Sequence, residues 1–258
     1  MPRTIDAPGV TPRRTTDDVH AAANAAQGEG KREYVQRMFS DIAPRYDLLN
    51  HVLSMNIDKR WRQKALTALA WMAAPAGRYL DLCAGTLDVG ALLVKQPGFG
   101  GFVAGADFAV PMLQYGTGKA PRSVLAPVGA DALLLPFGNA SLDGAIVAFG
   151  IRNVADLDAG LREVRRVLRP GARFVILEFS TPRFALVRQA YLAYFHHVLP
   201  FIGRLVSGHA SAYTYLPLSV ANFPTEETLA DHMRAAGFST VSWERLTFGI
   251  AAIHTGTA

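Results

Sequence analysis

The feature that most constrains the fold is a series of short apolar segments between residues 78 and 179, which alternate with segments of helical periodicity. The strands we expect are residues 78–83, 101–107, 123–128, 144–149 and 173–179. The helices expected among them are residues 89–95, 110–118 and 156–168, the last stopped by the Pro170-Gly171 turn. Strands that are apolar throughout and separated by helices are typical of a parallel sheet covered on both faces. The chain is therefore expected to be an α/β protein.

Residues 31–74, which precede the first strand, predict an N-terminal helical cap. One helix begins at Glu33 and ends before Pro44, and a second begins at Asp58. The apolar faces of the two helices are expected to contain Val35, Met38, Phe39, Ile42, Trp61, Ala65, Leu66, Leu69 and Met72.

The ends of the chain follow other patterns. Residues 1–30 are rich in Ala, Pro, Thr and Gly without apolar periodicity, so we expect a disordered tail. Residues 181–222 are rich in aromatic residues and are expected to form an insertion, or lid, over the carboxyl edge of the sheet. After a helix at 225–236, two strand-like runs at 241–247 and 250–255 are separated by two residues, which predicts an antiparallel pair.

Composition narrows the class of protein. With 258 residues, 50% hydrophobic and 18% charged, residues 31–258 are expected to form one globular domain. We find no apolar run of about 18 residues and no signal peptide, and the single cysteine, Cys83, fits a reducing cytoplasm. The basic residues are scattered, and those of "LREVRRVLR" are expected on a solvated helix face, so a nucleic-acid partner is not expected.

Acidic residues lie at the ends of the first three expected strands, where ligands of open α/β sheets bind. The stretch "YLDLCAGTLDVG", residues 79–90, contains Asp81 and then Gly85, whose backbone can approach a ligand closely. Asp107 ends the second strand and can bind ribose hydroxyls, whereas Asp131 follows the third and can accept a bond from an adenine amino group. These residues predict a nucleoside-containing cofactor.

The number of glycines in this loop distinguishes a nicotinamide cofactor from S-adenosylmethionine. A nicotinamide cofactor requires three glycines as G-x-G-x-x-G, and only Gly85 is available here. An acid in the first strand followed by a shortened glycine loop fits S-adenosylmethionine better, because that molecule has no pyrophosphate to place on a helix N-terminus.

Successive motifs of the chain resemble those of the demethylmenaquinone methyltransferases and the related ubiquinone-pathway C-methyltransferases. The resemblance covers residues 34–256 and includes "MFSDIAPRYDLLNHVLSMNIDKRWR", "ADALLLPF", "AFGIRNV", "VLRPGARFVILEFSTP", "HHVLPFIGRLV" and "AGFSTVSWERLTFGIAAIH". It implies a class I methyltransferase fold, Rossmann-like, with a seven-stranded, mostly parallel sheet whose last strand is antiparallel.

By position, the resemblance assigns Thr86 and Asp107 as cofactor-binding residues, and Asp131 and Ala132 as the pair beside the adenine. The chain departs from the family pattern at two positions. Leu87 replaces the last glycine of D-x-x-x-G-T-G-D, and Ala148 replaces a serine that bonds the cofactor in many members. We expect Leu87 to begin a helix with negative φ and to turn its side chain toward the core, which would leave cofactor binding intact.

The resemblance also implies a reaction, in which a ring carbon of a reduced prenylated quinone receives the methyl group. Arg152, in the "FGIRN" turn, is a candidate partner of a quinolate oxygen, and Asn153 can orient that oxygen or a water. A purely structural ion pair of Arg152 is the alternative. The candidate proton acceptors are His197, Tyr46, Asp47, His209 and a water held by the turn, and no metal site is expected.

The leading hypothesis is conversion of demethylmenaquinol to menaquinol in menaquinone biosynthesis. Two alternatives stay open: the C-methylation step of ubiquinone biosynthesis, and a catalytically silent binding protein, which only Leu87 and Ala148 favour. The expected partners are a prenylated naphthoquinol and, transiently, the membrane surface, with a cytoplasmic or peripheral location at the inner face of the cytoplasmic membrane. Homo-oligomerisation is left open.

Overall fold

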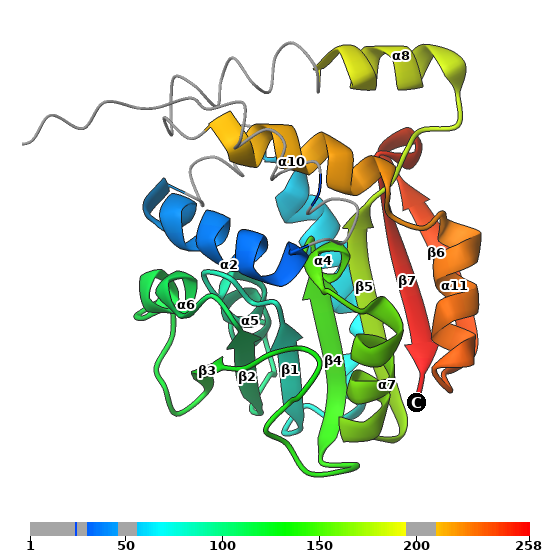
Figure 1. Cartoon of the computed structure of the whole chain (residues 1–258). Helices are drawn as coiled ribbons and strands as arrows, with labels where there is room; N and C mark the ends of the chain where they lie inside the picture. The colour runs from blue at the N-terminus through cyan, green and yellow to red at the C-terminus, as the bar shows by residue number, and fades with distance from the viewer. Residues whose placement is uncertain (1–23, 25–29, 46–55, 195–209) are drawn as a thin grey trace, which may run out of the picture.

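A computed structural model describes residue 24 and residues 30–45, 56–194 and 210–258. One seven-stranded sheet lies at its centre, with the strand order β3-β2-β1-β4-β5-β7-β6 (Figure 1). The strands are β1 (Arg78–Leu82), β2 (Phe102–Asp107), β3 (Leu125–Gly129), β4 (Leu142–Ala148), β5 (Leu168–Phe179), β6 (Ser239–Leu246) and β7 (Ala251–Thr257). Strands β1 to β5 are parallel to one another, and β7 is antiparallel to both β5 and β6. The expected mostly parallel sheet with an antiparallel last strand is confirmed.

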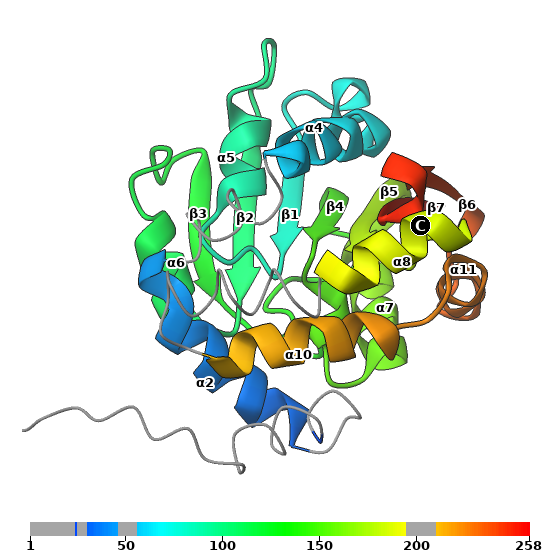
Figure 2. The ribbon, with the colours of Figure 1, turned by 90° about the horizontal axis from the view of Figure 1, so that it is seen from above.

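Helices cover both faces of the sheet and one of its edges. The α-helices of the described residues are α2 (Lys31–Ile42), α4 (Ile57–Leu69), α5 (Asp88–Val94), α6 (Val110–Gly116), α7 (Leu157–Val167), α8 (Ala185–Ala193), α10 (Ala210–Ala221) and α11 (Glu226–Ala235). The short 3-10 turns are η1 (Ala43–Arg45), η2 (Trp71–Ala73), η3 (Ile151–Asn153) and η5 (Thr247–Gly249). Helices α4 and α5 lie on one face, α7 and α11 lie on the other, and α2 and α10 run across the carboxyl ends of the strands (Figure 2).

Apolar spacing explains why the helices pack where they do. In α7, Leu161, Val164 and Val167 recur at helical spacing and are fully buried against the sheet, as the sequence predicts. The helix begins where the Asp156 side chain accepts a bond from the Ala159 N–H, a standard N-cap. The helix stops before Pro170-Gly171 as expected, but β5 already begins at Leu168, so the Pro-Gly pair lies inside the strand and not before it.

The two N-terminal helices are confirmed with one correction. Helix α2 buries Val35, Met38 and Ile42, and α4 buries four of the predicted residues, namely Trp61, Ala65, Leu66 and Leu69. Met72 was expected on the same face, but α4 ends at Leu69 and Met72 is 68% exposed, because the chain turns there into η2.

The order of the strands defines where a ligand can bind. The chain runs from β1 outward to β3 and then returns to β4 beside β1. Loops from the carboxyl ends of β1 and β4 therefore leave in opposite directions and open a crevice at this switch point. A search of the described residues finds no helix long and apolar enough to cross a membrane.

Candidate functional site

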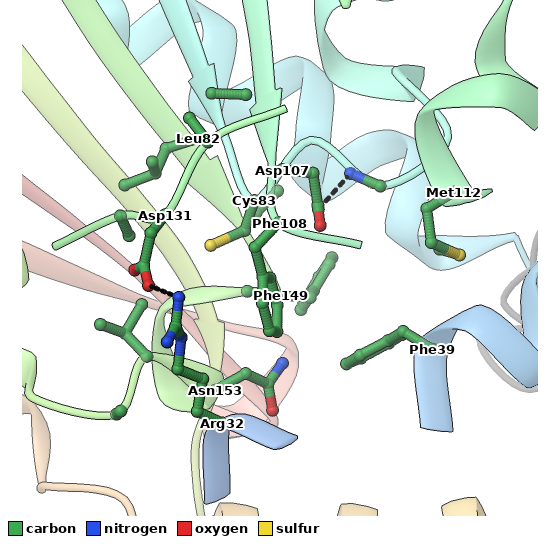
Figure 3. Close-up of a pocket in the computed structure, with 18 residues that line it drawn as sticks. Arg32, Phe39, Leu82, Cys83, Asp107, Phe108, Met112, Asp131, Phe149 and Asn153 are labelled. Carbon is green, nitrogen blue, oxygen red and sulfur yellow. Dashed lines mark hydrogen bonds and ion pairs between the residues drawn. The ribbon is translucent and has the colours of Figure 1, made fainter. Parts of the chain in front are cut away.

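A pocket lies at the carboxyl ends of β1, β2, β3 and β4, and α2 closes one side of it (Figure 3). Its open space, part of which is continuous with solvent, is about 710 Å³. The described residues that line it include Arg32, Phe39, Leu82, Cys83, Gly85, Asp107, Phe108, Met112, Asp131, Ala132, Ala148, Phe149, Gly150 and Asn153. The pocket therefore combines apolar walls with carboxylates from two strand ends.

Asp107 joins the loop after β1 to the start of α6. Its Oδ2 accepts the Gly85 N–H at 2.8 Å, and its Oδ1 accepts the Ala109 N–H at 2.8 Å (Figure 3). Burial raises the pKa of this carboxyl, although the backbone N–H groups act in the opposite direction. Gly85 itself has a φ of 51°, a conformation that glycine adopts without steric cost. The acid thus fixes the glycine loop and borders the pocket at the same time.

Leu87 adopts a conformation that the sequence analysis did not predict. Its φ is 64°, in the left-handed region, and not the negative value expected for a first helical residue. The other half of the expectation is confirmed, because the side chain is 2% exposed and belongs to the hydrophobic core. Burial of a leucine side chain contributes about 2 kcal/mol, comparable to the cost of about 1–2 kcal/mol for a left-handed non-glycine residue. Leu87 therefore keeps the glycine-like backbone and stays outside the pocket.

Asp81 and Thr86 lie deeper than the pocket. The Asp81 Oδ2 accepts the Gly90 N–H at 2.8 Å, which ties β1 to helix α5. Burial raises the pKa of Asp81 to about 7, and the bond from Gly90 acts against that rise. Thr86 is 2% exposed, and neither side chain is among the described residues that line the pocket.

Asp131 and Ala132, predicted beside the adenine, both line the pocket. The Asp131 carboxylate also forms an ion pair with Arg32 of α2, with Nη2 and Oδ2 2.9 Å apart (Figure 3). Arg32 was not predicted as a site residue, because nothing in the sequence shows that the start of α2 lies beside the loop after β3.

The two residues of the "FGIRN" turn have different surroundings. Asn153 lines the pocket, whereas Arg152 is not among the described lining residues. The Arg152 Nη1 lies 2.7 Å from Glu178 Oε1, and both side chains are almost completely buried. Arg152 also donates to the carbonyl of Phe149. The alternative of a structural ion pair therefore describes the observed contacts of Arg152.

Glu178 is a residue that sequence reasoning missed. It is 2% exposed, near the end of β5, and its carboxylate accepts bonds from Arg152 and from the Phe179 N–H. The available signal was a single acid within the apolar run "FVILEF" of a strand covered on both faces. Such an acid needs a buried cationic partner.

Four of the residues predicted as proton acceptors cannot be placed relative to the pocket. His197 and Tyr46, predicted as catalytic, lie outside the described residues, as do Asp47 and His209. Cys83 borders the pocket with a φ of 51°, and burial raises the pKa of its thiol, which disfavours the nucleophilic thiolate. Among the residues described, no cluster of histidine, cysteine and acidic side chains could hold a metal ion.

The residues that line the pocket suit a nucleoside. The loop at Gly85 has no side chain to obstruct a ligand, and Asp107 offers a carboxylate at the end of β2 for sugar hydroxyls. Ala132 and Phe108 are apolar lining residues that could contact a base, and Asp131 is a lining carboxylate that could accept a bond from its amino group. Ala148 lines the pocket without a side-chain hydroxyl.

Comparison with solved structures shows the same fold. A methyltransferase dependent on S-adenosylmethionine from Thermotoga maritima matches 86% of this chain and 98% of its own, with a TM-score of 0.59 and 17% identity. Phosphoethanolamine N-methyltransferase 2 from Haemonchus contortus, solved with S-adenosyl-L-methionine, matches 74% of this chain and 51% of its own, with a TM-score of 0.54 and 14% identity.

Comparison with curated proteins gives much higher identities. Demethylmenaquinone methyltransferase from Thermus thermophilus is 51% identical over 221 residues, which cover 85% of this chain and 99% of the relative. The Deinococcus radiodurans protein of the same name is 47% identical, over 88% of this chain and 94% of the relative. A Geobacter sulfurreducens protein named ubiquinone/menaquinone biosynthesis C-methyltransferase is 44% identical, over 88% of this chain and 89% of its own length.

The strand order and the pocket at the switch point define the class of this protein, which has the class I methyltransferase fold. Residues 27–258 match the model of the ubiE/COQ5 methyltransferase family, and the chain belongs to that family. The recognition made from the motifs is therefore confirmed.

Proposed function

We propose that this chain transfers a methyl group from S-adenosylmethionine to a ring carbon of demethylmenaquinol, and so forms menaquinol. The observation that carries the proposal is the 51% identity to a protein named demethylmenaquinone methyltransferase along 99% of that relative. The precursor of the ubiquinone pathway is a second substrate to be tested, because the 44% identical relative is named for both quinones.

S-adenosylmethionine supplies the methyl group on a sulfonium centre. The proposed cofactor residues are those at the strand ends: Asp107 for the ribose hydroxyls, Asp131 and Ala132 for the adenine, and the loop at Gly85 and Thr86, with Asp81 behind it. Holding the ring carbon in line with the methyl group accounts for much of the rate enhancement in such a displacement.

The "FGIRN" turn is the proposed acceptor side of the site. A ring carbon becomes nucleophilic as the neighbouring hydroxyl loses its proton, so the site must stabilise an oxyanion. Asn153 faces the pocket and donates to that oxygen, while Arg152, held by Glu178, fixes the turn behind it. His197 and Tyr46 stay candidates for the proton acceptor, beside Asp47, His209 and a bound water.

Two segments are proposed to cover the site. The described parts of residues 31–74 act as an N-terminal cap and those of residues 181–222 as a lid. The tail predicted at residues 1–30 lies almost entirely outside the described residues. In support, α2 and α10 lie next to each other across the carboxyl edge (Figure 2). Val35 and Met38 of α2 form a buried cluster with Tyr215 of α10.

The prenyl tail of the substrate favours a transient contact with the membrane surface. Phe184, just before α8, is 69% exposed, and Leu186, within α8, is 79% exposed. Phe248 of η5 is 72% exposed. A Cβ at Gly249 would lie 3.6 Å from the Pro182 Cα, so η5 and the segment before α8 are neighbours. Large exposed apolar groups gathered at one edge mark an interaction site. We propose that this edge rests on the lipid surface.

The decisive experiment is methyl transfer with the purified chain. Labelled S-adenosylmethionine and a short-chain demethylmenaquinol under reducing conditions should give labelled menaquinol, and a parallel reaction should contain the ubiquinone-pathway precursor. Binding of S-adenosylmethionine without methyl transfer to either quinol would refute the proposed reaction and favour a silent binding protein. Sedimentation velocity of the same preparation would show whether the active form is a homo-oligomer.

The membrane contact has its own test. Leu186→Asp should reduce co-sedimentation with anionic phosphatidylglycerol vesicles, whereas Met72→Asp should not, because the exposed Met72 precedes β1 at the opposite edge of the sheet. Equal binding of the wild type and both variants would contradict the assignment of this surface.

A further inference from the structure

A buried hydrogen bond connects helix α10 to the "FGIRN" turn. The Tyr215 hydroxyl donates to Asn153 Oδ1 at 3.1 Å, across 62 residues of sequence. Tyr215 is 1% exposed and Asn153 is 8% exposed, so water does not compete freely for this bond. A hydrogen bond in such surroundings orders its partners more strongly than one at the surface.

The geometry points to Tyr215 as the positioning residue that orients the Asn153 amide for the acceptor oxygen. An asparagine amide has one acceptor oxygen and one donor nitrogen at the end of the same rotatable group. Because Tyr215 occupies the oxygen, the Nδ2 group is the end left for a ligand in the pocket that Asn153 lines. An amide held this way presents a donor, and not an acceptor, to the oxyanion that forms during methyl transfer.

The residue type at position 215 suits this role in two ways. Its ring packs in an apolar cluster with Val35 and Met38, and it lies 5.5 Å from the ring of Tyr34. Burial raises the pKa of Tyr215 to about 12, so the hydroxyl keeps its proton and remains a donor at the pH of the reaction. A phenylalanine would fill the same space without the bond to Asn153.

The bond also links helix α10, which lies over the site, to Asn153 on the acceptor side of the pocket. Phe39 and Phe108, which pack beside this cluster, line the cofactor pocket. Asn153 is therefore held in its donor orientation only when α10 lies against α2, as it does here. This inference rests on the proposed methyl transfer to a quinol, and it names the group that aligns the acceptor side of that reaction.

The test compares Tyr215→Phe with the full-length wild type in methyl transfer to a short-chain demethylmenaquinol. Loss of the hydrogen bond that orients the Asn153 amide should lower kcat about tenfold, with the KM for S-adenosylmethionine changed less than about twofold. Tyr79→Phe is the matched control: Tyr79 is also 1% exposed, and its hydroxyl donates to the Trp71 and Ala74 carbonyls away from the pocket. That variant should lose stability but keep the wild-type kcat.

A second readout needs no quinol. The chain has six asparagines, so selective ¹⁵N-asparagine labelling gives few side-chain amide signals, and Asn153→Asp identifies the pair from Asn153. In Tyr215→Phe that pair should shift or broaden, both with and without S-adenosylmethionine, and it should stay unchanged in Tyr79→Phe. An unchanged Asn153 signal, a wild-type kcat in Tyr215→Phe, or an equal loss of kcat in Tyr79→Phe would overturn the inference. If the wild type transfers no methyl group, the proposed function fails, while the amide signal still decides the role of Tyr215.

Discussion

The side chain of Leu87 occupies the space that a side chain at Gly105 would fill. A Cβ built on Gly105, in β2, would lie 2.2 Å from Leu87 Cδ2. On the other side, a Cβ on Gly116 of α6 would lie 2.8 Å from Leu87 Cγ and 2.4 Å from the Thr86 carbonyl oxygen. The leucine that replaces a loop glycine is therefore accommodated between two glycines from other elements.

This arrangement predicts a strong coupling between positions 87 and 105. Gly105→Ala should lower the free energy of unfolding by about 1–3 kcal/mol, because the added methyl group overpacks against Leu87. In a Leu87→Ala background the same change should be nearly neutral, since the space is then free. Urea unfolding of the four proteins gives the interaction energy. Additive effects of the two substitutions would contradict the packing described for Leu87.

Leu87 should affect stability more than cofactor binding. Leu87→Gly removes the steric cost of the positive φ but also the buried side chain, so the free energy of unfolding should fall by about 1–4 kcal/mol. Calorimetric titration should show that the wild type binds S-adenosylmethionine, with an affinity within a few-fold of the variant, because Leu87 does not line the pocket. No binding by the wild type together with binding by Leu87→Gly would show that the leucine blocks the site.

These contacts also show why the sequence predicts the pocket better than its details. Strand ends and their acids follow local patterns, so the places of Asp107 and Asp131 could be predicted from short stretches. The φ of Leu87 depends on glycines at positions 105 and 116, which are distant in sequence and look like ordinary strand and helix residues there. Leucine in a left-handed conformation is disfavoured locally, and only the tertiary packing reverses that preference.

The acceptor side of the site was harder still to predict. The motif places Arg152 and Asn153 at the same edge, but only the structure shows that Glu178 engages the arginine and Tyr215 engages the asparagine. Both partners come from other elements, and neither stands at a spacing that periodicity can detect. Side-chain partners across a sheet edge are set by topology, which the chain sequence encodes only indirectly.

The ion pair between Arg32 and Asp131 should compete with the cofactor. If the adenine amino group takes the place of Arg32 at Asp131 Oδ2, cofactor binding breaks the ion pair, so Arg32→Ala should strengthen binding of S-adenosylmethionine. The pair is partly exposed, with side-chain exposures of 58% and 27%, and such pairs contribute about 0.2–1 kcal/mol, or up to about fivefold in affinity. Calorimetry at low salt measures the gain.

Two comparisons sharpen this test of Arg32. The gain should shrink in about 0.5 M salt, because screening already weakens the pair in the wild type. Arg37→Ala removes an exposed arginine from the same helix and should leave the affinity unchanged. Weaker binding by Arg32→Ala would show that the arginine contacts the cofactor instead of competing with it.

Asp81 should make the stability of the fold depend on pH. Its pKa is about 7 in the folded chain against an ordinary 3.8, because burial disfavours the charged form. Between pH 3.8 and about pH 7, the folded state therefore keeps a proton on Asp81 that the unfolded state has released. The contribution of this protonated carboxyl to stability is fully present below about pH 4 and is lost as the pH rises through 7. Asp81→Asn cannot ionise, yet its amide oxygen can still accept the Gly90 N–H. As the pH rises from 5 to 7, the free energy of unfolding of the variant should increase by about 1–3 kcal/mol relative to that of the wild type.

Urea unfolding of both proteins at several pH values measures that relative gain directly. Asp41→Asn serves as the control, because it makes the same change of residue type at an exposed position on α2. A difference between Asp81→Asn and the wild type that stays constant from pH 5 to pH 8 would mean that Asp81 is ionised throughout this range. The bond from Gly90, together with the nearby charge of Arg62, would then outweigh the burial of the carboxylate.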